Sequence, residues 1–127
     1  MTTPTFDDIA KAKYILLTTF TKDGTPKPTA IWAAPDGDRL LLMTEEDSWK
    51  IKRIRNTPRV TLAICDARGK PKSEPIEAVA TVLDKSEAPA VIQAVNKRYG
   101  ILGWGFGLYM KLRGLDKKSV GVELKAA

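Results

Sequence analysis

A basic stretch between two apolar runs carries the side chains of this sequence that are best suited to chemistry. Residues 48–59 contain five lysines and arginines and no acidic residue. They follow the apolar run 40–43 and precede a second one, 60–65, and both runs are typical of strands. A helix that begins at Ser48 would present unpaired N–H groups and a partial positive charge at its N-terminus. The lysines of the helix would add positive charges that suit phosphate oxygens. The pattern indicates either a phosphate site against a sheet or a solvated basic helix.

The rest of the composition limits the kinds of catalytic and metal site that the chain can form. The chain contains no histidine, which excludes a Ser-His-Asp triad, a histidine-ligated zinc and a histidine general base. Acidic residues occur at turns and helix starts without forming an obvious catalytic pair, so no catalytic residue is assigned and no metal site is predicted. If the protein is an enzyme, we expect a bound cofactor to supply the reactive group.

The length and the net charge of the chain limit the classes of protein to which it can belong. The chain has 127 residues, of which 43% are hydrophobic, and we expect a single domain over residues 1–127. The formal net charge of +6 favours anionic partners such as nucleotides, phosphorylated cofactors, nucleic acid or acidic lipid. The single cysteine, Cys65, lies in an apolar run and is expected to be a buried, reduced thiol. With no signal-peptide pattern and no apolar run of about 18 residues, we expect no transmembrane segment and a cytoplasmic location.

The periodicity predicts mainly strands with inserted helices. Asp23-Gly24 signals a hairpin, and residues 35–38 indicate another turn. Ser86 is expected to cap a helix over 87–99. A parallel sheet would need a helix after nearly every strand, so we predict an antiparallel barrel of the mainly β (α+β) class. The six predicted strands are 14–20, 28–34, 39–44, 60–65, 75–83 and 119–124, and the other predicted helices are 5–12 and the basic helix from residue 48.

Several short motifs in a fixed order carry a family resemblance. The motifs are Asp23-Gly24-x-Pro26-x-Pro28-x-x-x-x-Trp32, Leu40-x-x-Met43-Thr44, Ser48-x-Lys50-x-Lys52-x-Ile54, Asn56-Thr57-Pro58-Arg59-Val60, Glu77-Ala78-Val79-Ala80 and Lys97-Arg98-Tyr99-Gly100. In their order and spacing the chain resembles the split-barrel flavin and deazaflavin reductases related to pyridoxamine 5′-phosphate oxidase. It resembles in particular the actinobacterial branch that uses coenzyme F420. The resemblance implies a six-stranded antiparallel split β-barrel of the FMN-binding type.

The same resemblance implies a function and a site. It implies a homodimer with the cofactor between the two barrels, and hydride transfer from reduced F420 to an unsaturated small organic substrate. Lys50 would contact the cofactor phosphate, with Ser48 and Lys52 at neighbouring positions. One departure is Trp49, which stands where the flavin-dependent oxidases carry an arginine. The implied cofactor-binding residues are Lys50, Ser48, Lys52, Thr44, Met43, Thr29, Ala30 and Ile31.

Charge and apolar surface fit this interpretation. A groove lined by Lys27, Lys50, Lys52, Arg53 and Arg55 would attract the acidic oligoglutamate tail of F420. Residues 45–47 are acidic and are expected to point outward, away from the phosphate. Ring binding also needs apolar walls, which Trp32, Met43 and the segment 104–106 could supply.

Two alternatives stay open at this point. The first is the same fold with FMN in place of F420. The second, more remote, is a small basic barrel that binds nucleic acid, although the aromatic residues lie mostly in apolar runs instead of alternating with basic ones. The glycine-rich segment 100–114 is read as a cap or dimer contact, with a lid or a membrane contact as further readings. The identity of the substrate stays open.

Overall fold

One antiparallel sheet dominates this computed structural model, which describes residues 3–98 and 119–127. Within those residues the strand order is β2-β1-β5-β6-β7-β4-β3, and every neighbouring pair runs antiparallel. The strands are β1 (Ile15–Phe20), β2 (Pro26–Ile31), β3 (Ala34–Asp36), β4 (Arg39–Glu45), β5 (Arg59–Ile64), β6 (Ile76–Val82) and β7 (Ser119–Ala126).

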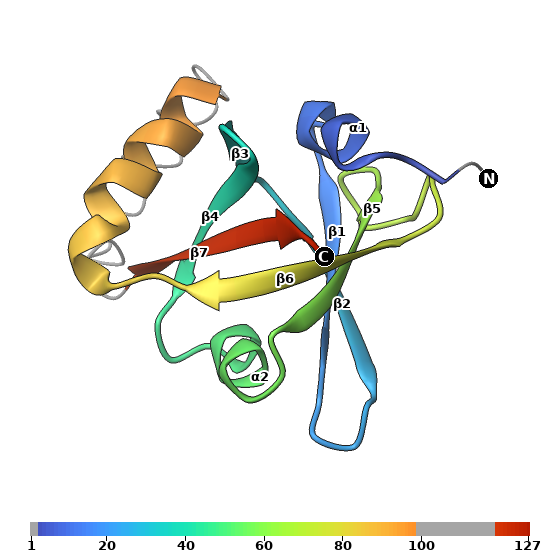
Figure 1. Ribbon diagram of the computed structural model, residues 1–127, viewed down its shortest axis with the longest axis horizontal. Helices are drawn as coiled ribbons and strands as arrows, with labels where there is room; N and C mark the ends of the chain where they lie inside the picture. Colours follow the sequence, from blue (N-terminus) through green and yellow to red (C-terminus); the bar gives the residue numbers. More distant parts are fainter. Residues whose placement is uncertain (1–2, 99–118) are drawn as a thin grey trace.

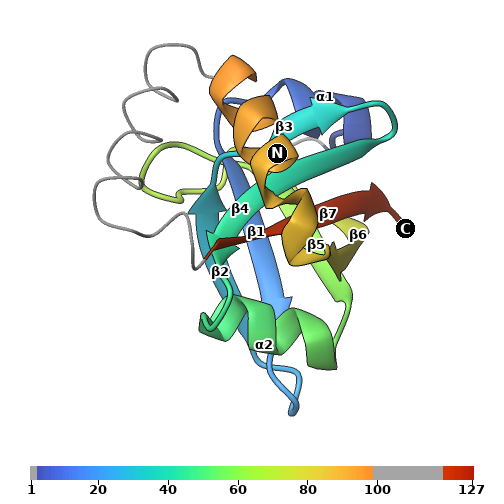
Figure 2. The same cartoon turned by 90° about the vertical axis from the view of Figure 1, so that its left-hand side faces the viewer.

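The sheet curls into a half-barrel (Figures 1 and 2). Strands β2 and β3 stand at opposite ends of the strand order, yet only two residues of the chain separate them. The curl gives the sheet an inner and an outer face, and in β1 Ile15, Leu17 and Thr19 are buried while the residues between them are half-exposed. The inner face carries the core, which includes Ile15, Leu17, Leu40, Leu42, Val60, Leu62, Val122 and Leu124. The sequence prediction of a mainly β split barrel is therefore confirmed.

The strand count differs from the prediction, and the reason is local. Residues 35–38 were predicted to be a turn, but only Gly37 and Asp38 turn the chain. Ala34–Asp36 instead form β3 and pair with the first residues of β4, so the sheet has seven strands where six were predicted. Gly37 makes the tight turn at φ +64°, a conformation that suits glycine.

Short helices close the ends of the half-barrel. Helix α1 (Phe6–Lys11) begins at Thr5, whose hydroxyl accepts from the Asp8 N–H while the Asp8 carboxylate accepts from the Thr5 N–H. Helix α2 (Trp49–Asn56) connects β4 to β5. No helix within residues 3–98 and 119–127 is long and apolar enough to cross a membrane.

A third helical segment lies against β7. It starts as the 3₁₀ turn η1 (Lys85–Glu87) and continues as helix over residues 88–98. The predicted cap at Ser86 is wrong, because the Asp84 carboxylate accepts from the Ser86 N–H at 3.0 Å and caps the turn two residues earlier. A Cβ at Gly121 would lie 2.8 Å from Val91 Cγ2, so the absent side chain in β7 is what lets this helix approach the sheet. The predicted helix end at Gly100 lies outside the described residues.

Candidate functional site

A pocket of about 260 Å³ lies where β2, β4, α2 and the helix over residues 88–98 meet. The described residues around it are apolar apart from one charged side chain, the ammonium of Lys50. Among the described residues, those that line it are Ala30, Ile31, Trp32, Met43, Lys50 and Val95. Four of these six were predicted cofactor contacts, and Trp32 was predicted to be an apolar wall.

Lys50 enters the pocket because of the way helix α2 sits on the barrel. Ile51 and Ile54 are buried in the core and fix the rotation of the helix about its axis. Lys50 is consequently half-buried, and burial lowers the pKa of its ammonium, with the charge of nearby Arg53 as a second cause. No carboxylate in residues 3–98 or 119–127 forms an ion pair with it. A half-buried cation without an anion is a group that gains from binding one.

The two predicted hydroxyl groups lie at the start of the same helix. Ser48 is the N-cap, and its Oγ accepts from the Ile51 N–H at 3.4 Å. Thr44 Oγ1 lies 3.5 Å from Ser48 Oγ, at the outer limit of a hydrogen bond. Neither residue lines the pocket, so the structure gives Ser48 a capping role and places Thr44 beside it.

Two other predicted residues are not brought to this pocket. Lys52 is exposed, and its ammonium lies 4.6 Å from the centre of the Trp49 ring. Two residues along a helix correspond to about 200° of rotation, so Lys50 and Lys52 point to opposite sides. Thr29 is paired with Leu17 across β1 and shares the core side of the sheet with it.

The predicted basic groove is divided among different faces of α2. Arg53 Nε donates to the buried Thr19 Oγ1 at 2.7 Å, which ties the helix to β1. Arg55 lines a separate cavity of about 660 Å³ between α2 and the end of β6. The acidic residues before the helix do not line the Lys50 pocket, and Glu46 pairs with Lys85 at 3.1 Å instead. These basic residues lie on different sides of α2 because a helix distributes consecutive residues around its axis.

Val95 is a pocket residue that the sequence did not indicate as one. It lies on the helix over residues 88–98, for which the sequence analysis predicted a helix and no part in the site. No local pattern could have placed it in the same pocket as Met43, because that arrangement depends on how this helix packs against the sheet. The segment 104–106, predicted to be a further apolar wall, lies outside the described residues, as does the rest of 100–114.

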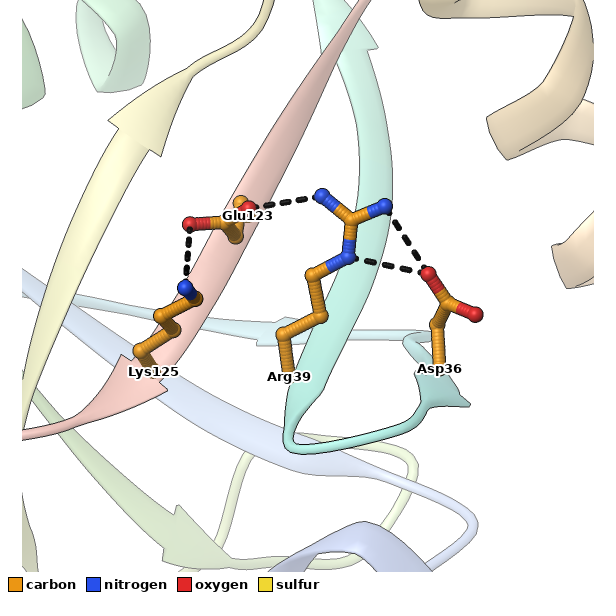
Figure 3. A network of polar contacts seen from close by, with 4 residues as sticks. All are labelled: Asp36, Arg39, Glu123 and Lys125. Carbon is orange, nitrogen blue, oxygen red and sulfur yellow. Dashed lines mark hydrogen bonds and ion pairs between the residues drawn. The ribbon is translucent and has the colours of Figure 1, made fainter.

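A polar network on the outer face of the sheet is distinct from the pocket (Figure 3). Arg39 Nη1 lies 2.6 Å from Glu123 Oε2, and its Nε donates to Asp36 Oδ2 at 2.9 Å. Lys125 lies 3.9 Å from the other Glu123 oxygen. The two carboxylates raise the pKa of Arg39 and join β3, β4 and β7 across the hairpin. This network has a structural explanation and does not belong to the candidate site.

Comparisons with known proteins agree on the fold. The model of the family described as pyridoxamine 5′-phosphate oxidase matches residues 3–124. Among curated proteins there is no significant match.

Three solved structures illustrate the likeness. The conserved hypothetical protein Rv2991 from Mycobacterium tuberculosis is 25% identical over 94% of this chain and 76% of its own, with a TM-score of 0.68. A protein described as an F420 reductase is 20% identical over 98% of this chain and 94% of its own, with a TM-score of 0.64. HutZ, the haem storage protein from Vibrio cholerae, is 14% identical over 94% of this chain and 84% of its own, with a TM-score of 0.67.

Proposed function

Because the chain belongs to the pyridoxamine 5′-phosphate oxidase family, we propose that it is an oxidoreductase whose Lys50 pocket holds part of a flavin-type cofactor. The first candidate is coenzyme F420, which when bound supplies a hydride for an unsaturated small organic substrate, and FMN is the alternative. Lys50 carries the proposal: it is half-buried, has no acidic partner among the described residues, and is the one charge among the described residues that line an apolar pocket.

The surroundings of Lys50 suit a phosphate. The residue lies in the first turn of α2, where the helix dipole and the free N–H groups add positive potential. The exposed carboxylates of Glu45 and Asp47 do not line the pocket, so they do not occupy the place of the anion. The apolar walls, Trp32 and Met43 among them, suit a ring system and keep water from it.

The pocket is too small to hold a whole cofactor. Its volume of about 260 Å³ lies below the range of about 300–1,000 Å³ that is usual for drug-sized ligands. We therefore propose that the protein works as a homodimer, with a second copy completing the groove. Light scattering on the purified protein would test the dimer independently of any cofactor.

Two observations support testing F420 before FMN. The net charge of +6 favours the more anionic of the two cofactors. Trp49 stands where the flavin-dependent oxidases carry an arginine, so one cation of their FMN site is missing here. The F420 reductase among the similar structures is 20% identical to this chain, so it supports the fold and does not choose between the two cofactors.

A direct titration tests the proposal. Purified protein would be titrated with reduced F420 and, separately, with FMN, while cofactor fluorescence and the melting temperature are followed. We expect saturable binding of F420 with a dissociation constant near the micromolar range and weaker binding of FMN. Tighter binding of FMN would select the alternative cofactor. Absence of binding of both at about 100 μM would contradict the proposed function.

A further inference from the structure

The side of α2 that faces away from Lys50 carries a second apolar groove. Its volume is about 230 Å³, and it lies between α2 and the start of the β1–β2 turn. Phe20 and Trp49 supply its aromatic walls, while Lys22, Lys52 and Arg53 place positive charge around it. Neither the family nor the proposed cofactor accounts for this combination of aromatic and basic side chains. We propose that this groove and its rim dock the protein on a membrane surface that contains anionic lipid.

The first argument is the exposure of Trp49. Its relative exposure is 71%, and the one other exposed large hydrophobic residue in the described part of the chain is Val79 at 42%. An indole combines an apolar body with a polar N–H, which suits the boundary between water and lipid headgroups. The side chain can enter that boundary without rearrangement of the described barrel, because most of its surface is exposed.

The second argument is the charge at this end of the molecule. Both views show the β1–β2 hairpin projecting at the same end as α2 (Figures 1 and 2). Lys22 and Lys27 on the hairpin and Lys52 and Arg55 on the helix are all exposed. The acidic side chain of the hairpin, Asp23, is held in the turn by hydrogen bonds with Thr21 and Thr25. Projecting cations of this kind gain free energy near anionic lipid headgroups.

The third argument separates a lipid surface from nucleic acid. Single strands bind by stacking bases on open aromatic faces. Here one face of the Trp49 ring is covered by the Lys52 ammonium at 4.6 Å, and the Phe20 ring is covered by the Arg59 guanidinium at 4.6 Å. The cations lie over the rings, where they would hinder stacking, while the exposed indole remains free to insert among headgroups.

Vesicle flotation tests the inference with the full chain. Vesicles of phosphatidylcholine containing phosphatidylglycerol would be compared with vesicles of phosphatidylcholine alone, at low and high salt. We expect binding only to the anionic vesicles, and we expect high salt to weaken it because the Debye length shortens. Equal binding to both vesicle types, or none to either, would overturn the proposal. The test needs no cofactor, so its outcome is independent of the proposed function.

Two double variants that remove the same number of charges test whether the membrane contact lies at this groove. The double variant Lys22→Gln/Lys52→Gln should lower the vesicle partition coefficient roughly 30-fold, about fivefold for each lysine. The control Lys70→Gln/Lys72→Gln removes the same charge from two exposed lysines in the β5–β6 loop and should leave the coefficient within about twofold. Equal losses in the two double variants would show that only net charge matters, and would overturn the assignment of this groove.

Trp49 supplies a readout that does not rely on loss of binding. Brominated lipids should quench the fluorescence of the wild-type protein more than that of Trp49→Phe, since only the first has an indole at the proposed contact. Equal quenching would contradict the insertion of Trp49. Tighter binding of an oligothymidine strand than of vesicles would assign the groove to nucleic acid, and loss of a dimer in Trp49→Ala would assign it to a second copy. Each of these two results would overturn the proposal.

Discussion

Two lysines on helix α2, two positions apart, occupy opposite environments. Lys50 is half-buried in an apolar pocket, where burial lowers the pKa of its ammonium. Lys52 is exposed and lies over the Trp49 ring. The residue type is the same and the helix is the same, so the difference arises only from rotation about the helix axis. The basic residues of one helix therefore do not all belong to one binding site. The way the helix packs on the core decides which cation can contact an anion in the pocket.

The buried face of the helix sets this rotation. Ile51 and Ile54 are the two residues of α2 that enter the core, and both are almost wholly buried. On the next face, the hydrogen bond from Arg53 to Thr19 holds the helix against β1. Because these contacts lie between the two lysines around the axis, loosening them would remove the difference between Lys50 and Lys52.

The largest expected effect therefore comes from Ile54→Ala, which loosens the contact that sets the rotation of α2. Deletion of a buried isoleucine side chain should lower the free energy of unfolding by about 2–4 kcal/mol, because it removes apolar contacts and leaves a cavity. Urea unfolding would measure it. The adjacent exposed residue provides the control, since Arg55→Ala should change the free energy by no more than about 0.5 kcal/mol. Similar values for the two variants would show that α2 does not pack as described.

The second effect tests the two lysines separately by removing the charge of each. Lys50→Met should raise the dissociation constant of the cofactor roughly 10–100-fold, the cost of losing a charge-assisted contact with phosphate. Lys52→Met should change it by less than about threefold, since Lys52 does not reach the pocket. Fluorescence titration would measure both. A loss of equal size in the two variants would support the prediction that Lys52 binds the cofactor as well as Lys50.

Much of the fold could be predicted because strand alternation is a local signal. The apolar run 14–20 was predicted to be a strand and forms β1, and the Asp23-Gly24 turn joins β1 to β2 as predicted. The missed strand, β3, contains Pro35 and Asp36, which are common in turns. Its pairing with β4 depends on the whole sheet curling back on itself, and that curl is not visible in a window of a few residues.

The candidate site was predictable only in part, for a related reason. The motif located the helix and Lys50, but Lys50 and Lys52 have equal propensities and equal charges. Telling them apart requires knowledge of which face of α2 meets the core, and Ile51 and Ile54 show that face only once the helix boundaries are known. Val95 and the Trp49 groove depend on contacts between distant segments, so no spacing rule reveals them.

A third, smaller effect concerns Ser48, the N-cap of the helix that carries both lysines. Ser48→Ala should lower the free energy of unfolding by about 1 kcal/mol, since it removes the acceptor for the Ile51 N–H. Ser48→Asp keeps a capping oxygen and should retain most of the stability. The added carboxylate would nevertheless weaken cofactor binding, because it brings a negative charge close to the phosphate that Lys50 is proposed to hold. Chemical denaturation and titration together would separate capping from phosphate contact; unchanged binding in Ser48→Asp would place the phosphate elsewhere.

The smallest expected effect is a pH dependence that only the buried lysine should show. Burial, and then the charge of Arg53, lower the pKa of Lys50 below that of an ordinary lysine. The folded protein thus releases this proton at a lower pH than the unfolded chain does. Between the two pKa values the unfolded state binds more protons, so this group's contribution to stability rises with pH. The ammonium is lost over the same window, so cofactor binding should weaken as stability increases.

Opposite trends in stability and binding distinguish Lys50 from every exposed lysine of the chain. Urea unfolding and cofactor titration from about pH 7 to about pH 10 would be carried out on the wild type, Lys50→Met and Lys52→Met. Subtracting the Lys50→Met curves cancels the titration of the other lysines. The difference should show stability rising and affinity falling with pH, whereas subtracting the Lys52→Met curves should show neither. A difference curve that is flat for Lys50→Met would mean that its ammonium is as well solvated as that of Lys52, and the two sides of α2 would then be equivalent.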